Sequence, residues 1–286
     1  GDLLTKRLQE LGGTVREDKA GEAIGGNCGN LVADFPATDG LESLPTVMLT
    51  AHMDCVEPCA GIHPVIEDGI IRSDSTTILG ADDKAGVTAI LEALRQLRAH
   101  GPLQVVFTVA EENGVHGSQH LDSSLLHADM GFTLDTHGHP GVMSYKAPGK
   151  NQIHIHIAGK AAHAGVEPEN GINAIQAAGV LLADASQGRI DVETTCNIGR
   201  IAGGSATNVV ADSCDIYYES RSRDTEKLER ITQRIIDHFR LGEESTGCKI
   251  TAEVSPDYGP YEIAKDAPAI KAAARAAEKL GFPVEL

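Results

Sequence analysis

The chain has 286 residues, of which 41% are hydrophobic and 23% charged, the usage of an ordinary folded protein with a sizeable core. Its net charge is −17, with 24 Lys and Arg against 41 Asp and Glu, so we expect neither nucleic acid nor an anionic membrane as a partner. The longest apolar runs, such as residues 105–110, are far shorter than the ~20 residues that span a bilayer, and we expect a soluble protein.

The first half of the chain alternates strand and helix patterns. Short apolar runs predict four strands, at residues 30–35, 46–51, 104–110 and 131–135. Apolar positions spaced three and four apart predict two helices, at residues 5–11 and 84–100. This alternation favours an α/β fold with a mostly parallel central sheet and helices on both faces. In such sheets the functional side chains gather at the carboxyl ends of the strands.

The second half follows a different plan, in the order β-α-β-β-α-β. We predict strands at residues 152–158, 194–202, 209–221 and 249–254. Helical patterns between them cover residues 172–183 and 226–239. This order is the split βαβ, ferredoxin-like plan of an α+β module, which we expect as an inserted domain.

The domain boundaries follow from these two patterns. The first domain is expected at residues 1–143, the inserted domain at 144–255, and a return segment of the first domain at 256–286. The return segment contains a predicted helix at residues 267–280, and residues 282–286 begin to resemble a further strand.

The cysteines indicate a reducing compartment. Six of them form no C-x-x-C pair and no compact framework: Cys28, Cys55, Cys59, Cys196, Cys214 and Cys248. Reduced thiols in a cytoplasmic protein are therefore predicted. Residues 1–10 have the pattern of an amphipathic helix and not of a secretory signal, which points the same way. Cys55 and Cys59 lie near the candidate site, but a role as ligand or nucleophile is the weaker interpretation.

A histidine and a carboxylate follow the second predicted strand. In VMLTAHMDC, His52 and Asp54 come directly after the apolar run, with their side chains on the same side of the extended backbone. Such a histidine can bind a metal while the carboxylate orients its ring. A structural histidine explains this pair equally well, so the motif is weak alone.

Further carboxylates follow the next elements. In ILGADDKAGV, Asp82 and Asp83 stand at a helix start, where capping could explain one of them. In VVFTVAEENGVHG, Glu111 and Glu112 end an apolar strand, where adjacent like charges repel unless a cation lies between them. GFTLDTHG places Asp135 at another strand end.

One histidine with several carboxylates is the ligand mix of a pair of divalent ions. Zinc is favoured where imidazole takes part, with cobalt or manganese as alternatives. In two-metal hydrolases the ions activate a shared water, and a carboxylate that binds neither ion takes the proton. The sequence has no Gly-rich phosphate loop and no G-x-S-x-G motif that would favour another chemistry.

Taken in order, these motifs resemble the M20 metallopeptidase family, and GADDKAG followed by AEENG is most similar to its peptidase T branch. The resemblance runs along nearly the whole chain. It implies that His52 binds one metal, Asp82 bridges both, Glu112 binds the second and Asp135 completes the first. It also implies a cis peptide between Asp82 and Asp83.

The same resemblance implies roles for residues that bind no metal. Asp54 would hold His52, and Glu111 would be the general base. The inserted domain would be the lid and the dimer-forming domain. Its AAHAGVEPENGINA segment implies that His163 stabilises the oxyanion, often in the partner subunit's site. GGSATNVV and ESRSRD imply that Asn208 and Arg221 contact substrate, although Arg221 could equally pair with a surface acid.

The resemblance implies zinc-dependent hydrolysis of short peptides by a tripeptidase-like aminopeptidase that forms a homodimer. Two alternatives remain open: an N-acyl-amino-acid amidohydrolase on the same fold, and a catalytically silent homologue that binds peptide or metal. The family also has a last ligand histidine after a GGSD-like segment, and a further helix at its start. Neither falls within these residues, so we expect a fragment of a longer enzyme.

Overall fold

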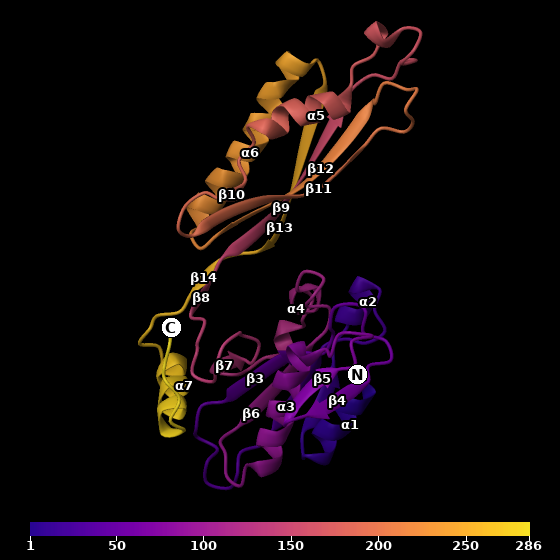
Figure 1. Cartoon of the computed structure of the whole chain (residues 1–286). Helices are drawn as coiled ribbons and strands as arrows, with labels where there is room; N and C mark the ends of the chain where they lie inside the picture. The colour runs from indigo at the N-terminus through magenta and orange to yellow at the C-terminus, as the bar shows by residue number, and fades with distance from the viewer. The chain divides into compact units, whose positions relative to one another are not determined.

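The computed structural model describes residues 1–286 and divides into two compact units (Figure 1). The first unit comprises Gly1–Met143 and Lys265–Leu286, and the second is the continuous segment Ser144–Ala264. The sequence predicts that the inserted segment ends at residue 255. The structure continues it to Ala264, because its last long strand runs on to Tyr258 and the chain then pairs with the start of the same unit.

The first unit contains a five-stranded sheet in the order β1-β2-β6-β3-β7. Its strands are β1 (Thr14–Glu17), β2 (Leu31–Phe35), β6 (Leu103–Thr108), β3 (Val47–His52) and β7 (Met130–Thr133). β3 lies between β6 and β7 and is parallel to both, whereas β2 is antiparallel to both β1 and β6. The sheet is therefore mixed, and its parallel part consists of the three strands that precede the candidate site residues.

Helices and one small hairpin complete the first unit. The helices are α1 (Asp2–Glu10), α2 (Ala20–Ile24), α3 (Ala81–Gln96), α4 (His116–Gln119), the 3-10 turn η1 (Ser123–Leu125) and α7 (Pro268–Lys279). The hairpin pairs β4 (Pro64–Glu67) with β5 (Ile70–Ser73). Residues 282–286 form no full strand, but Glu285 makes one parallel bridge with Val142.

The core of the first unit explains why these segments form strands. β6 is a central strand whose residues from Leu103 to Phe107 are all buried, which accounts for the apolar residues Val105, Val106 and Phe107. The one polar residue among them, Gln104, is hydrogen-bonded through its side chain to Asp34. Val87 and Ile90 of α3 belong to the same core cluster as β6. Burying each such side chain contributes about 1.5–3 kcal/mol. This packing fixes the carboxyl ends of β3 and β6 and the first turn of α3.

The second unit has the ferredoxin-like plan that the sequence predicts. Its elements are β9 (Gly149–Ala158), η2 (Pro168–Asn170), α5 (Ala174–Ala183), β10 (Gly188–Arg189), β11 (Thr194–Gly203), β12 (Ser213–Ser222), α6 (Thr225–Thr246) and β13 (Lys249–Tyr258). The sheet order is β10-β11-β12-β9-β13, with every pair antiparallel. A short ladder of β8 (Lys146–Ala147) with β14 (Tyr261–Glu262) joins the two ends of this segment.

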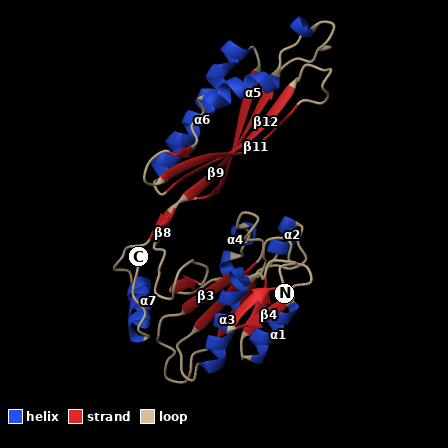
Figure 2. Ribbon diagram, in the orientation of Figure 1, coloured by secondary structure: helices blue, strands red, loops and turns tan.

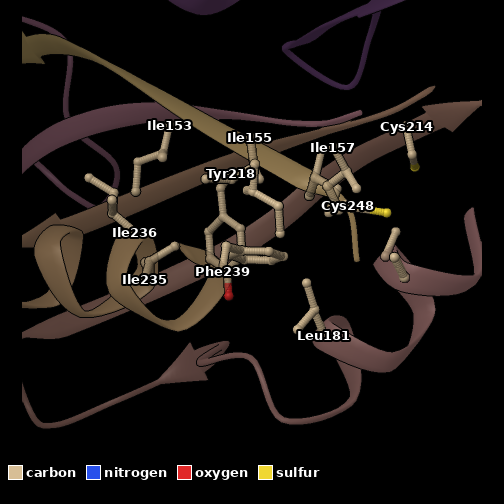
Figure 3. Packing of buried hydrophobic residues seen from close by; sticks show 14 of the residues in the cluster. Ile153, Ile155, Ile157, Leu181, Cys214, Tyr218, Ile235, Ile236, Phe239 and Cys248 are labelled. Carbon is tan, nitrogen blue, oxygen red and sulfur yellow. The ribbon is translucent and has the colours of Figure 1, made fainter. Parts of the chain in front are cut away.

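Both helices of the second unit lie on one face of its sheet (Figure 2). Alternate residues of β9, Ile153, Ile155 and Ile157, point into a core that also contains Phe239 of α6 (Figure 3). The ring of Tyr218 meets that of Phe239 edge to face, with centroids 6.4 Å apart. Cys196, Cys214 and Cys248 are buried in the same core and pack there as small apolar side chains.

None of the helices in the structure combines the length and the apolar composition that a membrane span requires.

Candidate metal centre

The predicted ligands of the first unit come from four neighbouring element ends. His52 is the last residue of β3, and Asp82 lies in the first turn of α3. Glu111 and Glu112 follow β6, and Asp135 follows β7. Since β6, β3 and β7 are adjacent and parallel, their carboxyl ends meet at one edge of the sheet, where functional side chains collect.

Contacts of both ring nitrogens fix the His52 ring. The side chain is buried, and Nδ1 lies 3.1 Å from the backbone oxygen of Asp54, which can only accept. Nδ1 therefore carries the proton, and Nε2 faces Asp82 Oδ1 at 3.0 Å. A histidine held in this way by its other ring nitrogen is a typical metal ligand.

The Asp54 carboxylate ties the histidine to the glutamate pair. Its Oδ1 accepts a hydrogen bond from the N–H of Glu111 at 3.1 Å, and its Oδ2 accepts one from the N–H of Glu112 at 3.2 Å. The same Oδ1 lies 3.5 Å from His52 Nδ1. Asp54 thus contacts both sides of the centre, and its role of holding His52 stays a prediction.

Two groups of possible ligands share one carboxylate. His52, Asp82 and Glu112 each offer a ligand atom within 4.8 Å of the others, and so do Asp82, Asp83 and Asp135. Asp82 belongs to both groups. This grouping differs from the expected one, in which His52 and Asp135 share an ion, and the ligand roles stay predictions.

Asp83 has the surroundings that most require a cation. Its side chain is buried, and Oδ1 accepts a hydrogen bond from the N–H of Gly86 at 3.0 Å, whereas Oδ2 has no hydrogen-bond partner. A buried carboxylate oxygen without a partner is costly unless a proton or a cation neutralises it. The sequence presents Asp83 only as a possible helix cap, and its adjacency to Asp82 is the one signal of a role in the site.

The backbone around Asp83 is adapted to this crowding. The Asp82–Asp83 peptide is cis, as the sequence resemblance implies. A Cβ at Gly86 would lie 2.5 Å from Asp83 Oδ1 and 2.6 Å from the carbonyl oxygen of Leu134. Glycine is therefore required where α3 passes the end of β7.

The electrostatics of the centre follow from crowded carboxylates. Burial raises the pKa of Asp83 and of Glu111. Burial, with the charges of Asp83 and Asp82, raises the pKa of Asp135 to about 6. Burial acts to lower the pKa of His52, but the hydrogen bond to Asp82 and the nearby carboxylates outweigh it and raise that pKa. Excess negative charge of this kind is stabilised by divalent cations, so the residues fit a metal site.

The predicted residues of the second unit fall into two places. His163 and Asn208 are exposed and lie on adjacent segments, where the N–H of Ala164 donates to the backbone oxygen of Asn208 at 3.0 Å. Arg221 lies on β12, opposite Lys150 and toward the other end of the strand.

Arg221 forms the acid pair that the sequence leaves open as an alternative. Its guanidinium donates to the Glu219 carboxylate at 2.9 and 3.1 Å. Arg221 is eight positions along β12 from Ser213, the end near Asn208, which corresponds to roughly 27 Å. The structure therefore brings His163 and Asn208 together but not Arg221.

Comparisons with known proteins agree with this organisation. The family described as "Peptidase dimerisation domain" matches residues 145–244, and the one described as "Peptidase family M28" matches residues 30–174. The first match falls within the second unit. Family M28 covers the candidate metal centre and ends within the second unit.

Two solved structures match nearly the whole chain. A tripeptidase from Staphylococcus aureus is 37% identical with a TM-score of 0.92, over 99% of this chain and 76% of that chain. An aminopeptidase PepT from Bacillus cereus is 41% identical with a TM-score of 0.88, over 100% and 77%. The Bacillus subtilis protein YqjE, described as uncharacterized, is 38% identical over 288 residues, which cover 99% of this chain and 77% of the relative.

The M28 match stops at residue 174, whereas the tripeptidase and PepT structures match both units. Divalent metal ions are the cofactors of such metallopeptidases, and the crowded carboxylates around His52 provide possible ligands for them. The chain belongs to the M20 family of metallopeptidases, in its peptidase T-like branch, and is a hydrolase of peptide bonds.

Proposed function

We propose that the protein is an aminopeptidase that releases the N-terminal residue from short peptides, tripeptides in particular, with two divalent ions at its centre. The observation that carries this proposal is Asp82, whose carboxylate belongs to both groups of possible ligands. A carboxylate shared by both groups would allow two ions to be held a few ångströms apart. The printed names of the two similar structures, a tripeptidase and an aminopeptidase, support the substrate class.

The proposed ligands are His52, Asp82, Glu112 and Asp135, with the buried Asp83 beside them. Zinc is proposed because an imidazole nitrogen takes part in an otherwise carboxylate set. When bound, two such ions lower the pKa of a shared water and polarise the scissile carbonyl.

Glu111 is the proposed general base. It belongs to neither group of possible ligands, and its backbone N–H is held by Asp54 at 3.1 Å. Burial raises the pKa of its carboxyl, which suits proton transfer near neutral pH. Glu111 would take the proton of the attacking water and then donate it to the nitrogen of the leaving amine.

The second unit is the proposed lid and the proposed site of homodimer formation. Its match to the peptidase dimerisation domain supports the second of these roles. His163 and Asn208 are proposed to contact the substrate, with His163 stabilising the oxyanion. Arg221 has five N–H donors, of which Glu219 occupies two, so donors remain for a substrate carboxylate. The spacing of the cysteines supports a cytoplasmic location.

One assay distinguishes this proposal from its alternatives. The full-length protein, loaded with zinc, is incubated with a tripeptide, with the same tripeptide acetylated at its N-terminus, and with an N-acetyl amino acid. We expect cleavage of the free tripeptide alone. Faster cleavage of the N-acetyl amino acid would establish the amidohydrolase alternative, and peptide binding without turnover would establish the silent homologue.

A further inference from the structure

Two thiols lie in the loop that leaves the metal centre. Cys55 and Cys59 follow Asp54 in the segment between β3 and β4, and both are half-buried, within reach of small solutes. The Cys59 thiol donates a hydrogen bond to Glu57 Oε1 at 3.3 Å, and Cys55 is near enough to contribute to the raised pKa of Cys59. By contrast, the three cysteines of the second unit are buried in its core.

Cys55 has a cation beside its sulfur. Lys84 Nζ lies 3.2 Å from Cys55 Sγ and 3.3 Å from the carbonyl oxygen of Gly80. Gly80 leaves room for this contact, because a Cβ there would lie 2.6 Å from Lys84 Nζ. The thiolate is the reactive form of cysteine, and a lysine ammonium beside the sulfur is a typical neighbour of reactive thiols.

Cys59 has a carboxylate beside its sulfur instead. Its Sγ lies 3.3 Å from Glu57 Oε1, and its N–H donates to Glu57 Oε2 at 3.0 Å. The hydrogen bond to Glu57, followed by that to Cys55, raises the pKa of the Cys59 thiol to about 11. Cys59 therefore keeps its proton near neutral pH. The two neighbouring thiols have opposite partners, a cation and an anion.

We propose that Cys55 and Cys59 are a redox-active thiol pair, which a peroxide oxidises to a reversible disulfide beside the metal centre. Cys55 would be the attacking thiol and Cys59 the resolving one. This assignment follows from the contacts of Lys84 with Cys55 and of Glu57 with Cys59.

The reaction has two balanced steps. The Cys55 thiolate attacks one oxygen of hydrogen peroxide, the O–O bond breaks, and Cys55 sulfenic acid and hydroxide form; the hydroxide combines with the proton that Cys55 lost. The Cys59 sulfur then attacks the Cys55 sulfur while Glu57 accepts the Cys59 proton and returns it to the leaving hydroxide. The two sulfurs are oxidised, the two peroxide oxygens are reduced, and two water molecules leave.

The test uses metal-free protein without substrate, so its outcome does not depend on the proposed peptidase function. The full chain is treated with hydrogen peroxide and digested, and its peptides are weighed by mass spectrometry. We expect a peptide linked between Cys55 and Cys59 that has lost two hydrogen atoms and regains them with dithiothreitol. Treated protein in which both thiols stay free, or are linked to other cysteines, would overturn the proposal.

Variants test the division of roles, with circular dichroism as the check on folding. In Cys59→Ser, dimedone should trap a sulfenic acid at Cys55, whereas in Cys55→Ser the labelling of Cys59 should be at least about tenfold slower. Lys84→Gln should slow disulfide formation, and Cys28→Ser is the matched control that should not. Equal labelling rates in the two serine variants would refute the roles. If a variant fails to fold, the mass of the oxidised wild-type peptide still decides.

Discussion

Nε2 of His52 lies 3.0 Å from Oδ1 of Asp82, although one residue ends a buried strand and the other begins a helix. A neutral imidazole whose other nitrogen donates to a backbone oxygen has its lone pair directed at this carboxylate. Two acceptors facing each other across 3.0 Å repel unless a proton or a metal ion lies between them. The pair therefore marks a position that a proton or a metal ion occupies.

Asp82→Asn should lower the affinity for divalent metal by more than about tenfold. The substitution removes the charge that both groups of possible ligands share and keeps the side-chain size. Asp82 is largely exposed, so the fold should persist. Zinc binding measured by isothermal titration calorimetry checks this, with Asp122→Asn, an exposed aspartate of the same unit, as the control. Unchanged zinc affinity and stoichiometry in Asp82→Asn would remove the basis for a shared ligand.

Glu111→Gln should abolish turnover without loss of metal. Replacing a general base typically lowers kcat by about 10²–10⁴-fold, while the possible ligands around it are untouched. Glu112→Gln is the matched comparison, since the adjacent residue belongs to a ligand group and its variant should lose metal. Both variants are assayed in the full-length enzyme for tripeptide cleavage and for bound zinc. A Glu111→Gln enzyme that is active, or that lacks zinc, would assign Glu111 another role.

Much of the site can be predicted from the sequence because its residues follow buried strands. His52 and Glu111 come directly after apolar runs, and such runs end where parallel strands end. The role of Asp83 could not be predicted, because its burial depends on how closely α3 approaches the end of β7 at Gly86. That distance is set by tertiary packing and leaves no pattern in the local sequence.

For the fold, too, the features that leave a pattern in the local sequence could be predicted, and the others could not. The ferredoxin-like unit follows from clear periodicity, because each of its long elements buries one face. The antiparallel pairing of β2 could not be predicted, since an apolar run does not indicate in which direction the strand runs relative to its neighbours. The strand β4 is not among the predicted strands. It is exposed at every position, so it lacks the alternation of buried and exposed residues that identifies a half-buried strand.

Asp215 should stabilise the second unit in a pH-dependent way. Its Oδ1 accepts hydrogen bonds from His156 and His154, each at 2.8 Å, and the bond to His156, followed by that to His154, lowers the pKa of Asp215. A carboxylate with a lowered folded-state pKa contributes stability above its unfolded pKa of about 3.9, and loses it as the pH falls through the folded value. Asp215→Asn should therefore cost more stability at neutral pH than at acid pH.

Gly86→Ala should destabilise the first unit, because the new Cβ would lie 2.5 Å from Asp83 Oδ1 and 2.6 Å from the Leu134 carbonyl oxygen. The Leu134 oxygen belongs to the backbone and cannot move aside without shifting the chain. The overpacking should therefore lower the free energy of unfolding by about 1–3 kcal/mol. Gly179→Ala is the matched control: this glycine also lies in a helix, but its Cβ would meet nothing within 4 Å. There alanine should stabilise the helix by about 0.5–1 kcal/mol. Urea unfolding followed by circular dichroism measures both changes. Equal effects of the two substitutions would mean that the close approach of α3 to β7, which buries Asp83, is not maintained in solution.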